Sequence, residues 1–414
     1  MRLSFKYYPK LNTKQLAIIE ELSFHTTKLY NIANYECITN GYKNYYDMES
    51  LLKTNWHKGF LHSHTYQQCL KVLEQNWKSY FTASKDYKKN PSKYLGQPRQ
   101  PKYKHKNLKN QVIFTNLAIR VHERTLKLSL SKAMRSTFDV NSLNLTLPKW
   151  VLKHLNMNAI QQAKWIWDTV RGQWYLLVIY KQVEASKPQS WHNIMAIDLG
   201  LDNLCAISFS DSEKQVLING KTLKSKNAYY NKEIARLTRI QMKATGNKKF
   251  KRTKRIQKLN RKRGYYMHDA LHQVSRRVIN LAKEQKCSTI VIGDIKGIKQ
   301  QSPIKGFVQI PVQKLVEFIK YKAQLTGIDV VMVKEAYTSG VSAYDLEPLT
   351  KQYYNKKRRI QRGLFKTNDG LLVNSDINGS LNIMRKHDSN VLPILIKRLR
   401  DNGCLNHPAR ITVA

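Results

Sequence analysis

Three acidic residues, Asp198, Glu335 and Asp376, stand at the ends of predicted elements in the second half of the chain. Asp198 follows the apolar run IMAI, Glu335 follows DVVMVK, and Asp376 lies in the first turn of the predicted helix SDINGSLNIMRK. Carboxylates gathered at the carboxyl ends of strands repel one another unless divalent cations neutralise them. Two Mg²⁺ ions, about 3.5–4 Å apart and held by oxygen ligands, would activate water and stabilise the leaving oxygen of a phosphodiester. Each carboxylate alone could instead be a turn cap or a favourable charge at a helix N-terminus.

The chain is strongly basic. Its 414 residues carry 72 Lys+Arg against 28 Asp+Glu, a formal net charge of +44, with a hydrophobic fraction of 42% that is typical of a globular protein. So much charge of one sign repels itself unless a polyanion neutralises it, so we expect a nucleic-acid partner.

The basic residues concentrate in a helical hairpin over residues 221–263 and in a second segment over residues 356–362. Lys and Arg in such segments contact phosphates. These contacts position the protein on the nucleic acid and add affinity, but they do not recognise the bases. The candidate phosphate-binding residues are Lys248, Lys249, Lys251, Arg252, Lys254, Arg255, Arg261, Lys262, Arg263, Lys356, Lys357, Arg358, Arg359 and Arg362.

The cysteines indicate a reducing compartment. Cys37, Cys69, Cys205, Cys287 and Cys404 are far apart and form no CxxC pair, so no zinc ribbon or redox motif is predicted, and we expect reduced, half-buried thiols. The N-terminus lacks the apolar core of a signal peptide, and no run approaches the roughly 18 apolar residues of a membrane span. We therefore expect a cytoplasmic protein with no membrane partner.

The first half of the chain predicts a strand, a helical block and then a β-rich block. RLSFKYYP alternates as a strand does, and Asn12 or Thr13 would cap helices that extend to about Lys89. Residues 90–111, rich in Pro and Lys, are typical of a basic loop or a flexible linker. From Gln111 onward the runs are β-rich and include a hairpin turned at Arg171-Gly172. The β block and the first strand together predict one β-barrel-like module interrupted by helices.

The second half predicts three strands, a long basic helical stretch, and then strand, helix, strand and helix. This is the order of an α/β ribonuclease-H-like domain. We expect Gly246 and Gly264 to interrupt the long helical stretch, Gly327 to end the next helix, and Ser375 to cap the last one.

IMAIDLGLDNLCAIS, the basic hairpin, EAYTSG and SDINGSLNIMRK together resemble the TnpB family. These are insertion-sequence-encoded, RNA-guided DNA nucleases related to the compact type V CRISPR effectors. The resemblance covers nearly the whole chain, with the specific motifs in the C-terminal half. It implies a β-barrel-like wedge domain, a helical recognition insertion with a basic linker, a RuvC-like nuclease domain and a C-terminal tail. The corresponding residues are 1–12 and 108–190, 13–107, 193–386, and 387–414.

The resemblance implies roles for two of the three acids, but at the position of the family's second acid this chain has a residue without a carboxylate. Asp198 in AIDLG matches the first RuvC acid, and Asp376 in SDINGSLNI matches the third. The middle motif of the family usually reads like IVIEDL, with a catalytic Glu. Here IVIGDI places Gly293 at that position, and Asp294 matches a neighbour that is not normally a metal ligand.

Three explanations for Gly293 stay open. Glu335 could take over the missing role, because its strand neighbours the strand of Gly293 in this fold, and the family usually has Pro at that position. Asp294 could serve directly as the second ligand, although adjacent residues of a strand point to opposite faces. Alternatively, the nuclease is inactive.

The chain differs from the family pattern a second time, in the segment where zinc ligands are expected. Family members usually carry two cysteine pairs within the segment that corresponds to residues 338–371, where this chain has no cysteine. We therefore expect no zinc and a basic insertion that contacts nucleic acid, or a solvated loop.

The resemblance implies an RNA-guided, Mg²⁺-dependent DNA endonuclease encoded by a transposon. It would use a guide RNA and cleave target DNA next to a short motif, in the prokaryotic cytosol or nucleoid. The alternatives are a nuclease-inactive, RNA-guided DNA-binding regulator and a DNA-joining transposase.

Overall fold

The chain forms two compact units, Met1–Val183 and Glu184–Ala414, each with its own hydrophobic core. We describe each unit by itself. The computed structural model describes residues 1–105, 109–149, 159–188, 190–246, 253–294, 310–361, 363–402 and 407–412.

The first unit contains two antiparallel sheets. One has the order β1 (Arg2–Tyr7), β7 (Gln173–Lys181), β6 (Ile160–Asp168) and β2 (Val112–Thr115); the other has the order β3 (Ile119–His122), β4 (Thr125–Ser129) and β5 (Ser142–Thr146). The turn at Gly172, with φ +65°, closes the predicted β6–β7 hairpin. The described strands form no single closed barrel, because the 3₁₀ turn η2 (Asn116–Ala118) carries the chain from the first sheet into the second.

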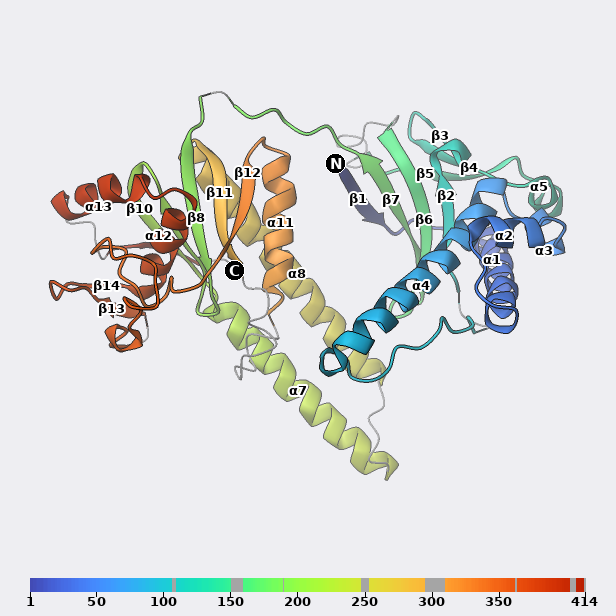
Figure 1. Cartoon of the computed structure of the whole chain (residues 1–414). Coiled ribbons are helices and arrows are strands. Elements are labelled where there is room, and N and C mark those ends of the chain that lie inside the picture. Colours follow the sequence, from blue (N-terminus) through green and yellow to red (C-terminus); the bar gives the residue numbers. More distant parts are fainter. Residues whose placement is uncertain are drawn as a thin grey trace. The chain divides into compact units, whose positions relative to one another are not determined.

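Helices make up the rest of the first unit (Figure 1). They are α1 (Thr13–Thr39), α2 (Tyr45–Leu51), α3 (Trp56–Gly59), α4 (Ser63–Lys89), the 3₁₀ turn η1 (Pro91–Lys93) and α5 (Lys132–Phe138). Asn12 caps α1 in a reciprocal capping box with Gln15, as its residue type predicts. The sequence interpretation missed α5, which is a short helix within an otherwise β-rich block.

The basic segment after α4 is partly ordered by asparagines of α1. Asn31 donates to the carbonyl of Lys104 at 2.8 Å and accepts from the amide of Lys104 at 2.7 Å. Asn34 donates to the carbonyl of Pro101 at 2.9 Å. Residues 101–104 therefore form an ordered loop and not a flexible linker.

The second unit has the predicted ribonuclease-H-like order. Its sheet runs β12 (Asp329–Lys334), β11 (Cys287–Asp294), β8 (Asn193–Leu199), β9 (Asn203–Phe209), β10 (Ser212–Asn219) and β15 (Ala409–Thr412). β8 is parallel to β11 and antiparallel to β9, and β11 is parallel to β12. Helices α8 (Lys254–Glu284) and α11 (Val312–Gln324) cover one face of the sheet, and α12 (Ser375–His387) and α13 (Val391–Asp401) cover the other.

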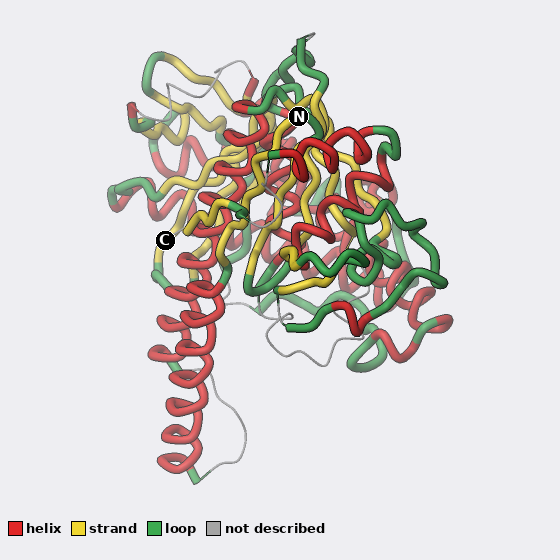
Figure 2. The backbone as a smooth tube through the Cα atoms, turned by 90° about the vertical axis from the view of Figure 1, so that its left-hand side faces the viewer, coloured by secondary structure: helices red, strands yellow, loops and turns green. Residues whose placement is uncertain are grey.

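Two long helices, α7 (Lys221–Thr245) and α8, lie side by side and project beyond the sheet (Figures 1 and 2). Arg263 of α8 joins them by donating to Asn227 of α7 at 2.7 Å. Gly246, with φ +60°, ends α7 as predicted, but the predicted break at Gly264 is wrong. A lone helical glycine costs only about 1 kcal/mol, which the packing of a long helix readily offsets.

Two helix ends differ in detail from the sequence interpretation. Gly327 lies just beyond the end of α11 with φ +72°, as expected of a helix stop. Ser375 is the first residue of α12 and not its cap. Asn374 is the cap, because its side chain accepts from the amides of Asp376 and Ile377 at 3.0 and 3.1 Å.

The C-terminal residues are folded into the second unit, although we expected a tail over 387–414. Leu392, Leu395, Ile396 and Leu399 of α13 are buried in the same core as α12. Strand β15 adds to the sheet edge by pairing parallel to β10. None of the described helices combines the length and apolarity that a membrane crossing requires.

Between β12 and α12, an arginine organises the cysteine-free segment. This segment contains turns, the 3₁₀ turn η4 (Lys356–Arg358), and a hairpin of β13 (Leu364–Lys366) and β14 (Leu372–Asn374). The guanidinium of Arg358 donates to both oxygens of Glu347 at 2.8 Å, to Asp345 at 2.6 Å and to the carbonyl of Lys366 at 2.9 Å. The three side chains are only 13%, 11% and 7% exposed. This buried ion network cross-links the segment.

We predict that Arg358→Ala lowers the free energy of unfolding by about 3–5 kcal/mol, because Asp345 and Glu347 lose the cation that compensates their burial. Lys357→Ala, at an exposed neighbour in η4, is the control and should change stability by less than about 0.5 kcal/mol. Urea unfolding of both variants measures the difference, and equal stability would contradict the cross-linking role.

Candidate active site

Asp198 lies on β8 directly beneath helix α12. A Cβ atom on Gly379 of α12 would overlap Oδ2 of Asp198 and lie 3.1 Å from its Cγ. Only glycine therefore lets the helix approach the strand this closely. The glycine of the SDINGSLNI motif accordingly brings the helix that carries Asp376 onto the strand that carries Asp198.

Glu335, the first residue after β12, fills the space that a side chain at position 293 would occupy. Gly293 pairs with Val333 on the neighbouring strand. A Cβ on Gly293 would overlap Oε1 of Glu335 and lie 2.8 Å from both its Cδ and its Cγ. The carboxylate thus enters from the adjacent strand at the position where the family pattern has a glutamate.

Helix α12 fixes the backbone on both sides of Glu335. Lys386 donates to the carbonyls of Lys334 and Ala336 at 2.8 and 2.6 Å. Asn382 donates to the carbonyl of Thr338 at 2.9 Å, and Thr338 in turn donates its hydroxyl to the carbonyl of Glu335 at 2.9 Å. The same helix therefore carries Asp376 and positions Glu335. The sequence interpretation missed Lys386 and Asn382, whose i and i+4 spacing on α12 was the available signal.

Asp376 has two partners from different elements. Its Oδ2 accepts from Asn203 at 2.7 Å, and its Oδ1 accepts from Arg359 at 3.2 Å. Asn203 begins β9, just after the Gly200–Asp202 turn that follows β8. We did not single out Asn203 from the sequence, although the hairpin after Asp198 necessarily returns it to the same sheet edge.

The three acids lie close enough to influence one another. Burial raises the pKa of Asp198 well above its ordinary value, and the negative charges of Glu335 and Asp376 raise it further, while Arg359 opposes them. Burial, and then Asp294, raise the pKa of Glu335 to about 7, with Lys386 opposing. The structure therefore concentrates negative charge that lacks a full counter-charge.

The donor set fits a hard divalent cation. All three side chains offer carboxylate oxygens, the ligands that Mg²⁺ prefers. Oε1 of Glu335 is buried and has no hydrogen-bond partner among the described residues, which is an expensive state unless a cation compensates it. Within the described ranges, no three His, Cys, Asp or Glu side chains stand close enough to form a ready-made metal cage. The acids are therefore neighbours whose side chains must still converge on an ion.

Asp294 is on the opposite side of the sheet. Along β11, Val291 packs in the core beneath α12, whereas Ile290 and Ile292 pack in the core beneath α8 and α11. By alternation Gly293 faces α12, as Asp198 does, and Asp294 faces the other layer. The alternation of side chains along β11 thus favours Glu335 over Asp294 as the partner of Asp198.

A cleft of about 1070 Å³ opens beside Asp376. Its lining includes Asn203 and four cations, which the sheet edge, helix α7 and the segment after η4 contribute. These cations are Lys221, Lys224, Arg359 and Arg410. The sequence interpretation named Arg359 individually and included Lys221 and Lys224 in the basic hairpin over residues 221–263. Arg410 was missed, because only the pairing of β15 brings it here. Such a cleft suits a polyanionic strand.

The other basic candidates separate into four groups. Exposed on α8 and η4 are Lys254, Arg255, Lys262, Lys356 and Lys357, whereas Arg261 and Arg263 are half-buried. Arg358 is committed to the buried network described above. Outside the described residues lie Lys248, Lys249, Lys251, Arg252 and Arg362.

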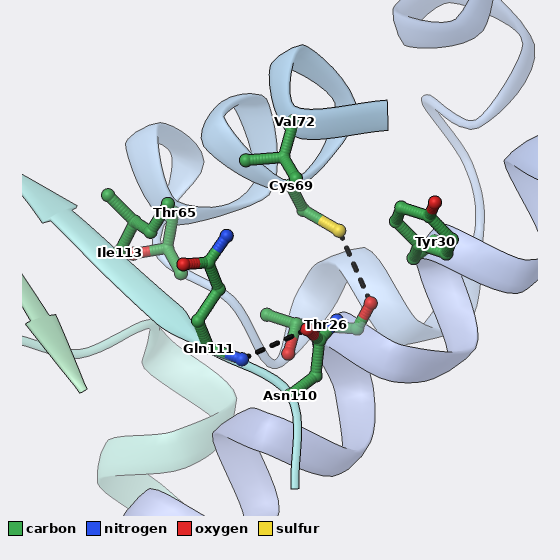
Figure 3. Close-up of a pocket in the computed structure, with 8 residues that line it drawn as sticks. All are labelled: Thr26, Tyr30, Thr65, Cys69, Val72, Asn110, Gln111 and Ile113. Atoms are coloured by element: carbon green, nitrogen blue, oxygen red, sulfur yellow. Dashed lines mark hydrogen bonds between the residues drawn. The ribbon is translucent and has the colours of Figure 1, made fainter. Parts of the chain in front are cut away.

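The small cavity in the first unit does not suit a substrate (Figure 3). Its volume is about 10 Å³, room for about one water molecule. Cys69 donates its thiol to the carbonyl of Thr26 at 3.2 Å and is buried, as are Cys37, Cys205 and Cys287, rather than half-buried as expected. These thiols are packing groups.

Comparisons with known proteins match two family models to separate parts of the chain. The OrfB_IS605 family, described as a probable transposase, matches residues 178–299, and the Cas12f1-like TNB domain matches residues 313–383. The CRISPR-associated endodeoxyribonuclease Cas12f1 of Syntrophomonas palmitatica is 27% identical over 41% of this chain and 35% of its own length. The TnpB-like protein ORF457 of Acidianus two-tailed virus is 24% identical over 58% of each chain. The matches thus span less than two thirds of either relative.

A solved structure shares the fold. The Cas12f1 chain in a cryo-EM structure of the Cas12f1–sgRNA–target DNA complex superposes with a TM-score of 0.55 at 16% identity, over 89% of this chain and 82% of that one.

We predict that Gly293→Ala destabilises the protein by about 1–3 kcal/mol, because the new methyl group overlaps the carboxylate of Glu335. In a Glu335→Ala background the same change should be nearly neutral, since the space is then vacant. Urea unfolding in a double-mutant cycle measures this coupling. Gly264→Ala, in open space on α8, is the matched control and should be neutral or stabilising. No coupling between positions 293 and 335 would contradict the packing described here.

We also predict a pH dependence from Glu335 in the absence of divalent cations. Its raised folded pKa of about 7 means that stability is fully present below pH 4.5 and is lost as pH rises through 7. The loss is at most about 3 kcal/mol. Unfolding from pH 4.5 to 8 should show a larger loss in the wild type and in Glu317→Gln, an exposed control, than in Glu335→Gln, where only Asp198 keeps a raised pKa at the site. Parallel curves for wild type and Glu335→Gln would exclude the shift.

Proposed function

Because the chain belongs to the TnpB family, we propose that it is a transposon-encoded, RNA-guided DNA endonuclease that requires Mg²⁺ and cleaves next to a short DNA motif. The observation that carries the nuclease proposal concerns Glu335: its Oε1, which is buried and has no hydrogen-bond partner among the described residues, occupies the space left by Gly293. A decayed site would have no reason to keep a buried charge there.

In this proposal Asp198, Glu335 and Asp376 hold the ions. When bound, Mg²⁺ activates water and neutralises the charge that develops on the leaving oxygen of the phosphodiester. Gly293 and Gly379 leave room for the carboxylates, and Lys386 and Asn382 hold the backbone of Glu335. Asn203 orients Asp376 through its 2.7 Å hydrogen bond.

The cleft beside Asp376 is the proposed path of the strand to be cut. Lys221, Lys224 and Arg410 would neutralise its phosphates. Arg359 now pairs with Asp376 and is 40% exposed, so it is placed to exchange this carboxylate for a phosphate once cations bind the acids. Base pairing with a guide RNA would supply the sequence specificity, while the protein reads duplex shape and the adjacent motif.

A second candidate, a nuclease-inactive RNA-guided DNA-binding regulator, is favoured by one observation. Arg359 already neutralises Asp376, and no three-acid metal cage is formed among the described residues. Such a protein would keep the basic cleft and lose the cleavage step.

The deciding experiment uses the purified protein with the RNA that copurifies with it. Sequencing this RNA identifies the guide, and a matched plasmid with Mg²⁺ is the substrate. We predict that Glu335→Ala lowers the cleavage rate at least about a hundredfold, because it removes a charge needed in the transition state. DNA affinity should stay within about twofold, since guide pairing supplies most of the specific binding.

Asp294→Ala is the matched control and should retain most of the activity, because its side chain faces the other layer. The reverse ranking of these variants would exclude Glu335 as the second acid. Guided binding by the wild type without cleavage would establish the regulator instead.

A further inference from the structure

A second basic pocket lies on the outer surface of the second unit, between α8 and α11. Its volume is about 470 Å³, and its lining includes His272, Arg276 and Arg277 of α8 and Tyr321 and Lys322 of α11. It shares no lining residue with the cleft beside Asp376. It is therefore a separate feature of the fold.

Lys322 is the unusual member of this pocket. Its side chain is only 4% exposed, and its ammonium donates to the carbonyl of His272 at 2.7 Å and to the hydroxyl of Ser275 at 2.6 Å. An ammonium carries three donors, so these neutral acceptors leave one further N–H. Burial, and then the positive charge of Arg276, lower the pKa of Lys322 to about 8. The protein thus places a buried cation beside another cation.

No carboxylate lines the pocket among the described residues. Glu284 reaches Arg277 at 3.7 Å but is 45% exposed, and Asp269 bonds to Gln273 at 2.9 Å. A buried charge without a counter-charge is costly, and a cation retained in such a place normally has a partner. The chemistry of the pocket therefore calls for an external anion.

A rigid aromatic wall adjoins the cations. The ring of His272 stacks on Phe318 with centroids 3.9 Å apart and planes 24° from parallel, and Tyr321 packs against the edge of Phe318. Burial, and then the neighbouring cations, lower the pKa of His272 to about 4. The ring is therefore a neutral platform beside the basic groups, a combination typical of sites for nucleic-acid strands.

We propose that this pocket binds a backbone phosphate of the RNA that the protein carries, through Lys322, Arg276 and Arg277. The choice of RNA rests on the proposed function and on position. Asp198 and Glu335 face α12, whereas the pocket lies on the helices that cover the opposite face of the sheet. A DNA strand that is cut must reach the acids, while an RNA that stays bound can be anchored away from them.

The test compares the whole wild-type protein with Lys322→Met, which keeps the apolar stem and removes the charge. The probes are a fluorescent 20-nucleotide oligouridylate and an oligothymidylate of equal length, titrated over a range of salt concentrations. RNA affinity should fall about tenfold, the effect of losing one charge-assisted hydrogen bond. The slope of log affinity against log salt should decrease by about 0.7 per lost contact. Oligothymidylate offers the same backbone phosphates and should lose a similar factor, so the copurified RNA makes the distinction: its amount per protein should fall in Lys322→Met and stay unchanged in Lys320→Met.

Lys320→Met is the matched control, since Lys320 is exposed on the same helix and does not line the pocket. It should lower RNA affinity less than twofold. If Lys322→Met fails to fold by circular dichroism, Arg276→Gln, at an exposed residue of the pocket, decides in its place. A 4-thiouridine-substituted oligouridylate should also crosslink to the peptide that contains Tyr321.

The outcomes separate this inference from the proposed function. If the wild type cleaves DNA under RNA guidance but Lys322→Met and Arg276→Gln bind oligouridylate as Lys320→Met does, the pocket is not an RNA site. Loss of oligothymidylate binding with an unchanged amount of copurified RNA in Lys322→Met assigns the pocket to DNA and also overturns the inference. If the wild type binds no RNA, the proposed function fails as well.

Discussion

The site in the second unit depends on the mutual repulsion of buried carboxylates. Asp198 and Glu335 both have raised pKa values because burial and neighbouring acids disfavour their charged forms. The fold nevertheless crowds them together, with glycine at 293 and 379 removing the atoms that would keep them apart. Arg359 and Lys386 only partly compensate this charge. The arrangement supports the proposal that the acids bind divalent cations.

Helix α12 holds the crowded carboxylates in place through several contacts. It presents Asp376, lies close on β8 at Gly379, and holds the backbone around Glu335 through Lys386 and Asn382. Its Asn378 also donates to the carbonyl of Val341 at 2.9 Å and accepts from the amide of Ala343 at 2.8 Å. The segment that begins at Glu335 is therefore ordered by the helix that follows it. The buried Arg358 network then holds the rest of that segment.

Much of the fold could be predicted from local patterns. The strand ending at Asp198, the strand before Glu335 and the helix with Asp376 are confirmed, because apolar periodicity and capping residues are local signals. The break at Gly264 was wrong because tertiary packing overrides a weak propensity. Helix α13 and strand β15 were missed, since the burial of α13 and the pairing of β15 depend on partners far away in sequence. The roles of the candidate residues in metal and phosphate binding stay predictions.

The sequence by itself determined the net charge of +44, the absence of cysteine between Cys287 and Cys404, and the substitution of glycine at 293. These are properties of composition and of single positions. Only the tertiary structure decided that Oε1 of Glu335 enters the space beside Gly293 and that Arg358 cross-links its segment. It also decided that Lys322 is buried beside a pocket that no carboxylate lines in the part of the chain the structure describes. Each of these depends on which elements pack together and how closely, which no local pattern encodes.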